Sequence, residues 1–187
     1  MLKYIEEASK YVELTGFRNV SVKDVENFVK AAREATLQKA SIQFFDADLV
    51  ATWQHLYFAV LNALAAFKNE RNISKSLAME VMLYASAQRQ IRKALQLIGV
   101  KSASVNVAVV IVGVNPDSVR AAVSAVSKRV GVEPDETVLE LTREKTQLIR
   151  KAFGISTEEL EAVDEKDAAQ ALVNLVIERT ALLSTQL

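Results

Sequence analysis

The chain contains no cysteine, one histidine, two prolines and five glycines among its 187 residues. Without cysteine it cannot form a disulfide, a cysteine-based zinc site, an iron–sulfur cluster or a catalytic thiolate. A single histidine excludes paired-histidine metal signatures such as H-E-x-x-H. Because the five glycines lie far apart, the sequence has neither a P-loop nor a dinucleotide-binding fingerprint. We therefore expect no catalytic residue, no bound metal and no cofactor.

The sequence shows neither a targeting segment nor a membrane span. Charged residues interrupt the first ten positions, so these do not form a signal peptide. Residues 49–67 carry no formal charge and have the length of a membrane span, but Thr52, Gln54, His55 and Asn62 favour a buried helix of a globular protein. We expect no membrane association and, in the absence of cysteine, a cytoplasmic location.

Periodicity and cap residues predict the secondary structure. Alternating or valine-rich segments predict strands at 11–17, 41–45, 104–112 and 137–141. Helical spacing predicts helices at 22–35, 49–67, 74–98, 115–130 and 142–153, a helix after Ser156, and a last helix towards 183. Asp46 or Asp48 is expected to cap the second helix, and Asp164 or Asp167 the last one.

The order of these elements predicts the fold class. Runs of consecutive helices separate the strands, which is typical of an α+β fold with a small, mostly antiparallel sheet of about four strands covered by six to seven helices. Length favours a single domain over 1–187, extended by an acidic helical C-terminal segment at 156–187. Within it, apolar residues recur every seven positions from Leu77 to Ile98, which predicts one continuous helix ended by Gly99.

The formal net charge of zero hides an uneven distribution. Seven basic and two acidic residues give segment 68–101 a charge of +5, whereas two basic and seven acidic residues give segment 156–187 a charge of −5. The acidic run fits a solvated helical face better than a docking surface. The basic segment is more specific, because part of it clusters where a connector enters a helix.

The connector brings Arg71, Asn72, Lys75 and Ser76 to a predicted helix N-terminus. Unpaired backbone N–H groups and the positive end of the helix dipole favour phosphate there. A single RNA strand needs phosphate donors together with groups that hold its bases, and Ile73, Met79 and Tyr84 offer apolar surface nearby. Composition alone favours the alternative, an ordinary solvated helix face beside core residues.

Two further candidates for chemistry have simpler interpretations. His55 lies within an apolar helix, where a buried histidine with satisfied hydrogen bonds is a more common finding than a catalytic base or a metal ligand. Asp46 and Asp48 could form a carboxylate pair, but their place before a helix favours capping.

Three groups of segments resemble a known family. They are DADLVAT at 46–52, SLAME at 76–80 with YASAQRQI at 84–91, and VLEL at 138–141 with LIR at 148–150. Together they resemble the archaeal branch of the PRPK-binding (TPRKB-like) subunits of the KEOPS complex. The resemblance spans about 41–155 and is most specific at 72–99, where Arg89, Gln90 and Ile91 are the best marker.

The resemblance implies a non-catalytic subunit with two direct partners. It implies binding to the small kinase/ATPase subunit of the complex and capture of the single-stranded 3′ CCA tail of tRNA, for threonylcarbamoyl-adenosine modification; other KEOPS subunits are indirect partners. The alternative is a purely structural kinase-binding adaptor. For the tRNA tail we expect the polar and basic residues Arg71, Asn72, Lys75, Ser76, Arg89 and Gln90, although Gln90 is equally suited to a hydrogen bond within the fold. For the kinase we expect Ile177, Leu182 and Leu183, for which core packing is the alternative.

Overall fold

The computed structural model describes residues 1–35, 40–163 and 167–185. It divides the chain into two compact units. The sheet unit comprises Met1–Ala47 and Gly99–Val138, and the helical unit comprises Asp48–Ile98 and Leu139–Leu187. The first contains all four strands and the second most of the helices, so the expected α+β class is confirmed.

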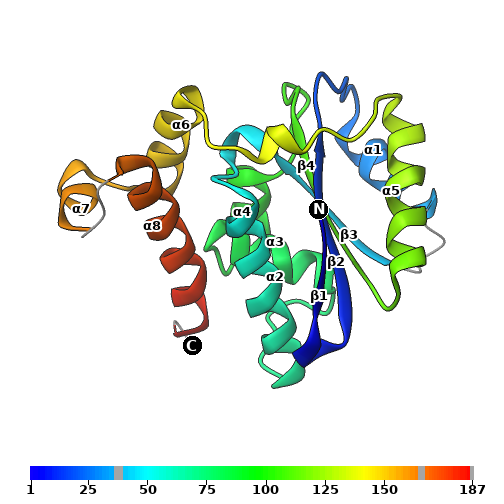
Figure 1. Cartoon of the computed structure of the whole chain (residues 1–187), viewed down its shortest axis with the longest axis horizontal. Helices are drawn as coiled ribbons and strands as arrows, with labels where there is room; N and C mark the ends of the chain where they lie inside the picture. Colours follow the sequence, from blue (N-terminus) through cyan, green and yellow to red (C-terminus); the bar gives the residue numbers. More distant parts are fainter. Residues whose placement is uncertain (36–39, 164–166, 186–187) are drawn as a thin grey trace. The chain divides into compact units, whose positions relative to one another are not determined.

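The four strands form one antiparallel sheet in the order β1-β2-β4-β3 (Figure 1). Strand β2 (Lys10–Phe17) and strand β3 (Ala40–Asp46) flank β4 (Val107–Gly113), and β1 (Leu2–Ile5) pairs with the outer edge of β2. Every residue of β4 is buried. Its continuous run of valines and isoleucine therefore matches a strand covered on both faces.

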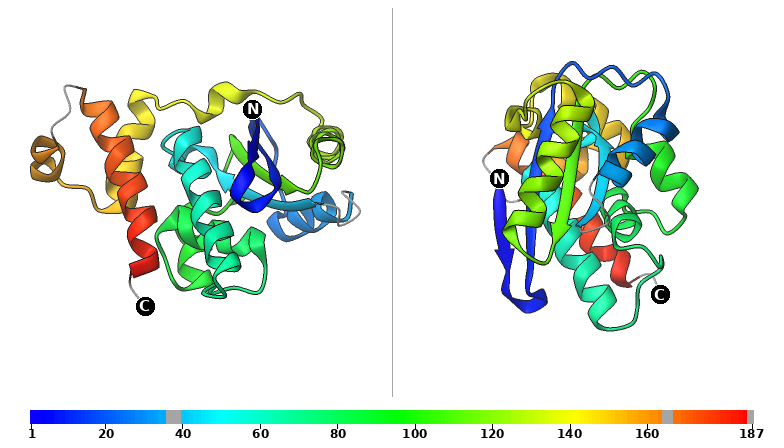
Figure 2. Two further views of the ribbon diagram at one scale, coloured as in Figure 1. Left: turned by 60° about the horizontal axis from the view of Figure 1, so that its bottom comes forward. Right: turned by 90° about the vertical axis from the view of Figure 1, so that its right-hand side faces the viewer.

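Helices α1 (Val25–Ala35) and α5 (Pro116–Val130) pack together beside the sheet (Figures 1 and 2). The Asn115 side chain caps α5 by accepting a hydrogen bond from Ser118 N–H, and Pro116 occupies the first turn. The core of this layer joins residues from β2, β3 and β4 to one face of α5, and its buried members include Phe17, Phe44, Val107, Val109, Ile111, Val119, Ala122 and Val126.

The expected strand at 137–141 is wrong. Glu136–Leu139 forms a 3₁₀ helix instead, and Val138 from this turn packs directly against the backbone of Gly16. A Cβ atom on Gly16 would lie 2.0 Å from Val138 Cγ2, so only glycine fits there. The fourth strand of the sheet is β1, which the charged N-terminal sequence does not predict.

The helical unit is built on α2 (Trp53–Lys68), which packs against α3 (Leu77–Ser86) and α8 (Ala168–Leu182) (Figures 1 and 2). Helix α4 (Ile91–Ile98) contacts α3, while α6 (Arg143–Phe153) and α7 (Thr157–Ala162) contact α8, which a 3₁₀ turn at Leu183–Thr185 extends. Within the described residues, no helix is both long and apolar enough to cross a membrane.

The predicted continuous helix at 74–98 is also wrong, because it breaks at Ala87. Ala87 adopts the left-handed conformation with φ 51°, and its N–H and that of Gln88 bond back to the carbonyls of Tyr84 and Leu83. This pattern ends a helix and normally uses glycine. The stripe of apolar residues spaced by seven is therefore not one face: Tyr84 is buried, whereas Ile91 is 43% exposed.

Most of the remaining helix ends follow their cap residues. Thr142 caps α6, a capping box of Ser156 and Glu159 begins α7, and Asp167 caps α8. The other candidate for the last cap, Asp164, lies outside the described residues. The expected capping of α2 by Asp46 or Asp48 is wrong, because this helix begins after Thr52.

Candidate functional site

The connector between α2 and α3 is shaped by its own polar side chains. Asn72 Nδ2 donates to the Ser74 carbonyl at 3.0 Å, and Ser74 Oγ accepts from Ser76 N–H at 3.2 Å. Ser76 Oγ in turn accepts from Met79 N–H at 3.4 Å and caps α3. Two of the residues expected at the RNA, Asn72 and Ser76, thus hold the connector in shape.

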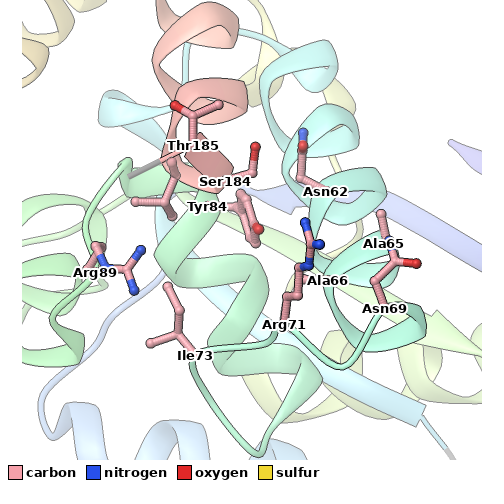
Figure 3. A pocket seen from close by; sticks show the side chains of 11 residues that line it. Asn62, Ala65, Ala66, Asn69, Arg71, Ile73, Tyr84, Arg89, Ser184 and Thr185 are labelled. Atoms are coloured by element: carbon pink, nitrogen blue, oxygen red, sulfur yellow. The ribbon is translucent and has the colours of Figure 1, made fainter. Parts of the chain in front are cut away.

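This connector forms one wall of a pocket of about 380 Å³ in the helical unit. The volume lies within the range of roughly 300–1,000 Å³ that is usual for ligand sites. Figure 3 shows the Tyr84 side chain between the guanidinium groups of Arg71 and Arg89, with Ile73 below. The lining comes from α2, the connector, α3, the segment before α4, and the C-terminal turn, and comprises Asn62, Ala65, Ala66, Asn69, Arg71, Ile73, Tyr84, Arg89, Leu183, Ser184 and Thr185.

The pocket is positively charged. Arg71 and Arg89 are basic, and none of the described residues that line the pocket is acidic. The Arg71 backbone N–H donates to Ala66 O at 2.9 Å, which fixes the backbone from which the side chain projects. Within the described residues, the Arg71 guanidinium has no protein acceptor. Two arginines at the mouth of one pocket suit phosphate or carboxylate, because guanidinium groups donate in pairs to such anions.

The remaining lining combines apolar surface with neutral hydrogen-bonding groups. Burial of the ring, together with the nearby Glu80 carboxylate, raises the pKa of Tyr84 against the opposing effect of Arg89. The phenol therefore stays neutral in the physiological range and can donate or accept a hydrogen bond. Ile73, which is 37% exposed, adds apolar surface, and the amides of Asn62 and Asn69 can pair with the edge of a base.

The structure brings together only part of the predicted RNA-binding set. Arg71 and Arg89 share the pocket although they are 18 positions apart in the chain. Lys75 and Gln90 are exposed but do not line it. Sequence reasoning missed Asn62 of α2, Asn69 just after this helix, and the C-terminal turn, since nothing in their spacing connects them to the basic segment.

The other sequence candidates for chemistry have structural roles. His55 is fully buried: its Nδ1 accepts from Ala51 N–H at 3.3 Å, and its Nε2 donates to Ala85 O at 2.7 Å. Burial lowers the pKa of His55 to about 4, with a smaller contribution from Lys145. Asp46 Oδ2 accepts from Ser104 Oγ at 2.7 Å. Among the described residues, no cluster of three or more His, Cys, Asp or Glu side chains could hold a metal ion.

Comparison with known proteins identifies the family. The family described as kinase binding protein CGI-121 matches residues 17–184. The chain belongs to this family. A relative named Regulatory protein Cgi121, from Methanocaldococcus jannaschii, is 35% identical over 113 residues, which cover 60% of this chain and 70% of the relative. The family resemblance drawn from the sequence is thus confirmed, and the match to CGI-121 covers every pocket-lining residue except Thr185.

Helix α8 and the 3₁₀ turn after it carry the apolar residues that the sequence suggests for partner binding. Leu183 is buried, Ile177 is half-buried, and Leu182 is 45% exposed. Leu182 also lines a second pocket, of about 250 Å³, together with Leu97 and Phe153. Leu182 and Leu183 therefore line different pockets. Of the three candidates, Leu182 is the most accessible to a partner.

Proposed function

We propose that this chain is a non-catalytic KEOPS subunit that binds the small kinase/ATPase of the complex and captures the single-stranded 3′ CCA tail of tRNA. Membership of the CGI-121 family supports the kinase partner. The observation that carries the tRNA part is the pocket where Arg71 and Arg89 flank Tyr84.

The end of a tRNA tail matches this pocket in chemistry. Its unpaired nucleotides carry phosphates that Arg71 and Arg89 neutralise, and flat bases that rest on the apolar surface of Ile73 and Tyr84. The side-chain amides of Asn62 and Asn69 are neutral and can reach base edges. The two guanidinium groups of the pocket attract the phosphates at one end of an RNA. Because the net charge of the whole chain is zero, we expect little binding along the rest of the RNA.

The test is a binding titration of fluorescently labelled tRNA with an intact or a trimmed CCA end. We expect intact tRNA to bind and trimming to weaken it strongly. Arg71→Ala and Arg89→Ala should each weaken binding of intact tRNA by about fivefold to tenfold, because each removes a charge-assisted phosphate contact. Equal affinity for intact and trimmed tRNA would refute the capture of the tail.

Arg92→Ala is the matched control. Arg92 lies on the same basic segment and is exposed on α4, but it does not line the pocket. Its replacement removes the same charge and should leave the affinity nearly unchanged. If all three substitutions weaken binding equally, the attraction comes from the general charge of the segment and not from the pocket.

The second candidate, a purely structural adaptor, is favoured by the family description, which names only a kinase. Co-purification with the kinase subunit, combined with no retention of tRNA at low salt, would support this candidate. Retention of tRNA by the chain without the kinase would exclude it.

A further inference from the structure

Glu80 is a fully buried carboxylate close to the pocket, and the binding of an anion gives no reason for a negative charge there. Its side chain is 0% exposed in α3, one turn before Tyr84. Oε1 accepts from Ile73 N–H at 3.0 Å and Oε2 accepts from Ser74 N–H at 2.7 Å. Each oxygen thus holds one of two consecutive backbone amides of the connector.

From this geometry we infer that Glu80 is the positioning residue of the pocket, fixing the connector so that Arg71 and Ile73 face the ligand. The inference rests on the proposed tRNA-tail function. Two bonds to adjacent amides remove the freedom of the peptide unit that joins Ile73 to Ser74. Because Arg71 is only two residues before Ile73, its backbone is held between this clamp and its own bond to Ala66.

The chemistry of the clamp needs a carboxylate and not merely a polar side chain. The two N–H groups bond to different side-chain oxygens, and a carboxylate offers two acceptor oxygens in that arrangement. A glutamine has the same shape but one acceptor oxygen, so its NH₂ group would face a backbone N–H. Glu80→Gln therefore keeps the packing of α3 and breaks one of the two bonds.

A negative charge behind the pocket repels a bound anion and therefore lowers its affinity. Glu80 stands on the same helix face as Tyr84, and its charge raises the pKa of Tyr84. Placing a carboxylate there weakens the attraction of the pocket for phosphate. In the proposed role, the order that Glu80 gives the connector outweighs this loss.

The experiment is a double-mutant cycle on the full chain, with intact tRNA as the probe. Glu80→Gln alone should weaken binding by about tenfold, since a hydrogen bond to a charged group is lost. In the Arg71→Ala background the same substitution should have a much smaller effect, because there is no longer a guanidinium to position. Hydrogen exchange should speed up at the amides of Ile73 and Ser74.

Ser86→Ala is the control for general loosening of α3. Ser86 is buried in the same helix and its Oγ donates to Leu83 O, away from the connector. We expect this substitution to lower stability without changing tRNA affinity. If Glu80→Gln does not fold, Glu80→Asp enters the same cycle, because it keeps the charge and withdraws the oxygens by one methylene.

The outcomes separate this inference from the proposed function. Effects of Glu80→Gln and Arg71→Ala that simply add, or an effect of Ser86→Ala as large as that of Glu80→Gln, would overturn the positioning role. Unchanged affinity in Arg71→Ala itself would instead contradict the proposed pocket.

Discussion

Acidification should destabilise the helical unit through His55. In the folded chain the pKa of this side chain is about 4, whereas its unfolded value is 6.5. Nε2 donates a hydrogen bond to Ala85 O, and Nδ1 already accepts a hydrogen bond from Ala51 N–H. A second proton on the ring would point at the Ala51 N–H, so the folded state holds the neutral form.

The sign and size of the effect follow from these two pKa values. Above pH 6.5 His55 is neutral in both states and stability does not depend on it. As the pH falls from 6.5 to 4 the unfolded chain binds a proton that the folded chain excludes, and unfolding becomes more favourable. The loss amounts to about 2 kcal/mol by pH 5 and about 3 kcal/mol in full.

The measurement is urea unfolding at several pH values, followed by fluorescence. Trp53 is the chain's only tryptophan and lies two residues before His55 in α2, so it reports this unit. His55→Gln is the comparison, because glutamine does not titrate. We expect the two proteins to differ in slope between pH 7.5 and 5, where carboxylates such as Asp135 contribute little, because hydrogen bonds from Thr137 and Arg18 hold the pKa of Asp135 below the ordinary value of a carboxyl group. Parallel curves over that interval would refute the reasoning.

Three other predictions concern binding and packing. Arg71→Ala should reduce the slope of log affinity against log salt for single-stranded RNA by about 0.7, as for one lost phosphate contact. Leu182→Asp should reduce kinase co-purification with little change in stability, whereas the buried Leu183→Ala should cost about 2–5 kcal/mol in urea unfolding. Gly16→Ala should cost about 1–3 kcal/mol in the same assay, because its Cβ would overlap Val138.

The sequence predicts those helices and strands whose formation depends on residues close together in the chain. The valine-rich strand β4, helix α5 after Asn115 and helix α7 after Ser156 all lie where they were expected, because the signals for each involve residues a few positions apart. The 3₁₀ turn at Glu136–Leu139 was missed because it depends on a residue far away in the chain, and strand β1 was missed because the charged N-terminal sequence hides a hairpin with the neighbouring β2. β1 exists through its pairing with β2, and the turn packs onto Gly16.

The candidate site shows the same division. The basic connector pointed to Arg71 and the family resemblance to Arg89, while the charge count of segment 68–101 included Glu80 with full weight. In the structure Glu80 is buried and bonded to the connector, so the exposed surface of this region is more basic than the count indicates. Burial of a single acidic residue cannot be derived from composition.

The break at Ala87 is what allows the pocket to exist. In a continuous helix, five residues turn the chain by about 140° beyond a full circle, so Tyr84 and Arg89 would point to nearly opposite faces. The left-handed Ala87 ends α3 and lets the chain turn before α4, and both side chains then line one pocket. The most specific part of the family resemblance, YASAQRQI at 84–91, spans this break. The motif is thus better explained by the turn that it builds than by a helical face. Tyr84 before the turn supplies the ring, and Arg89 after it supplies the guanidinium, that the proposed RNA tail requires.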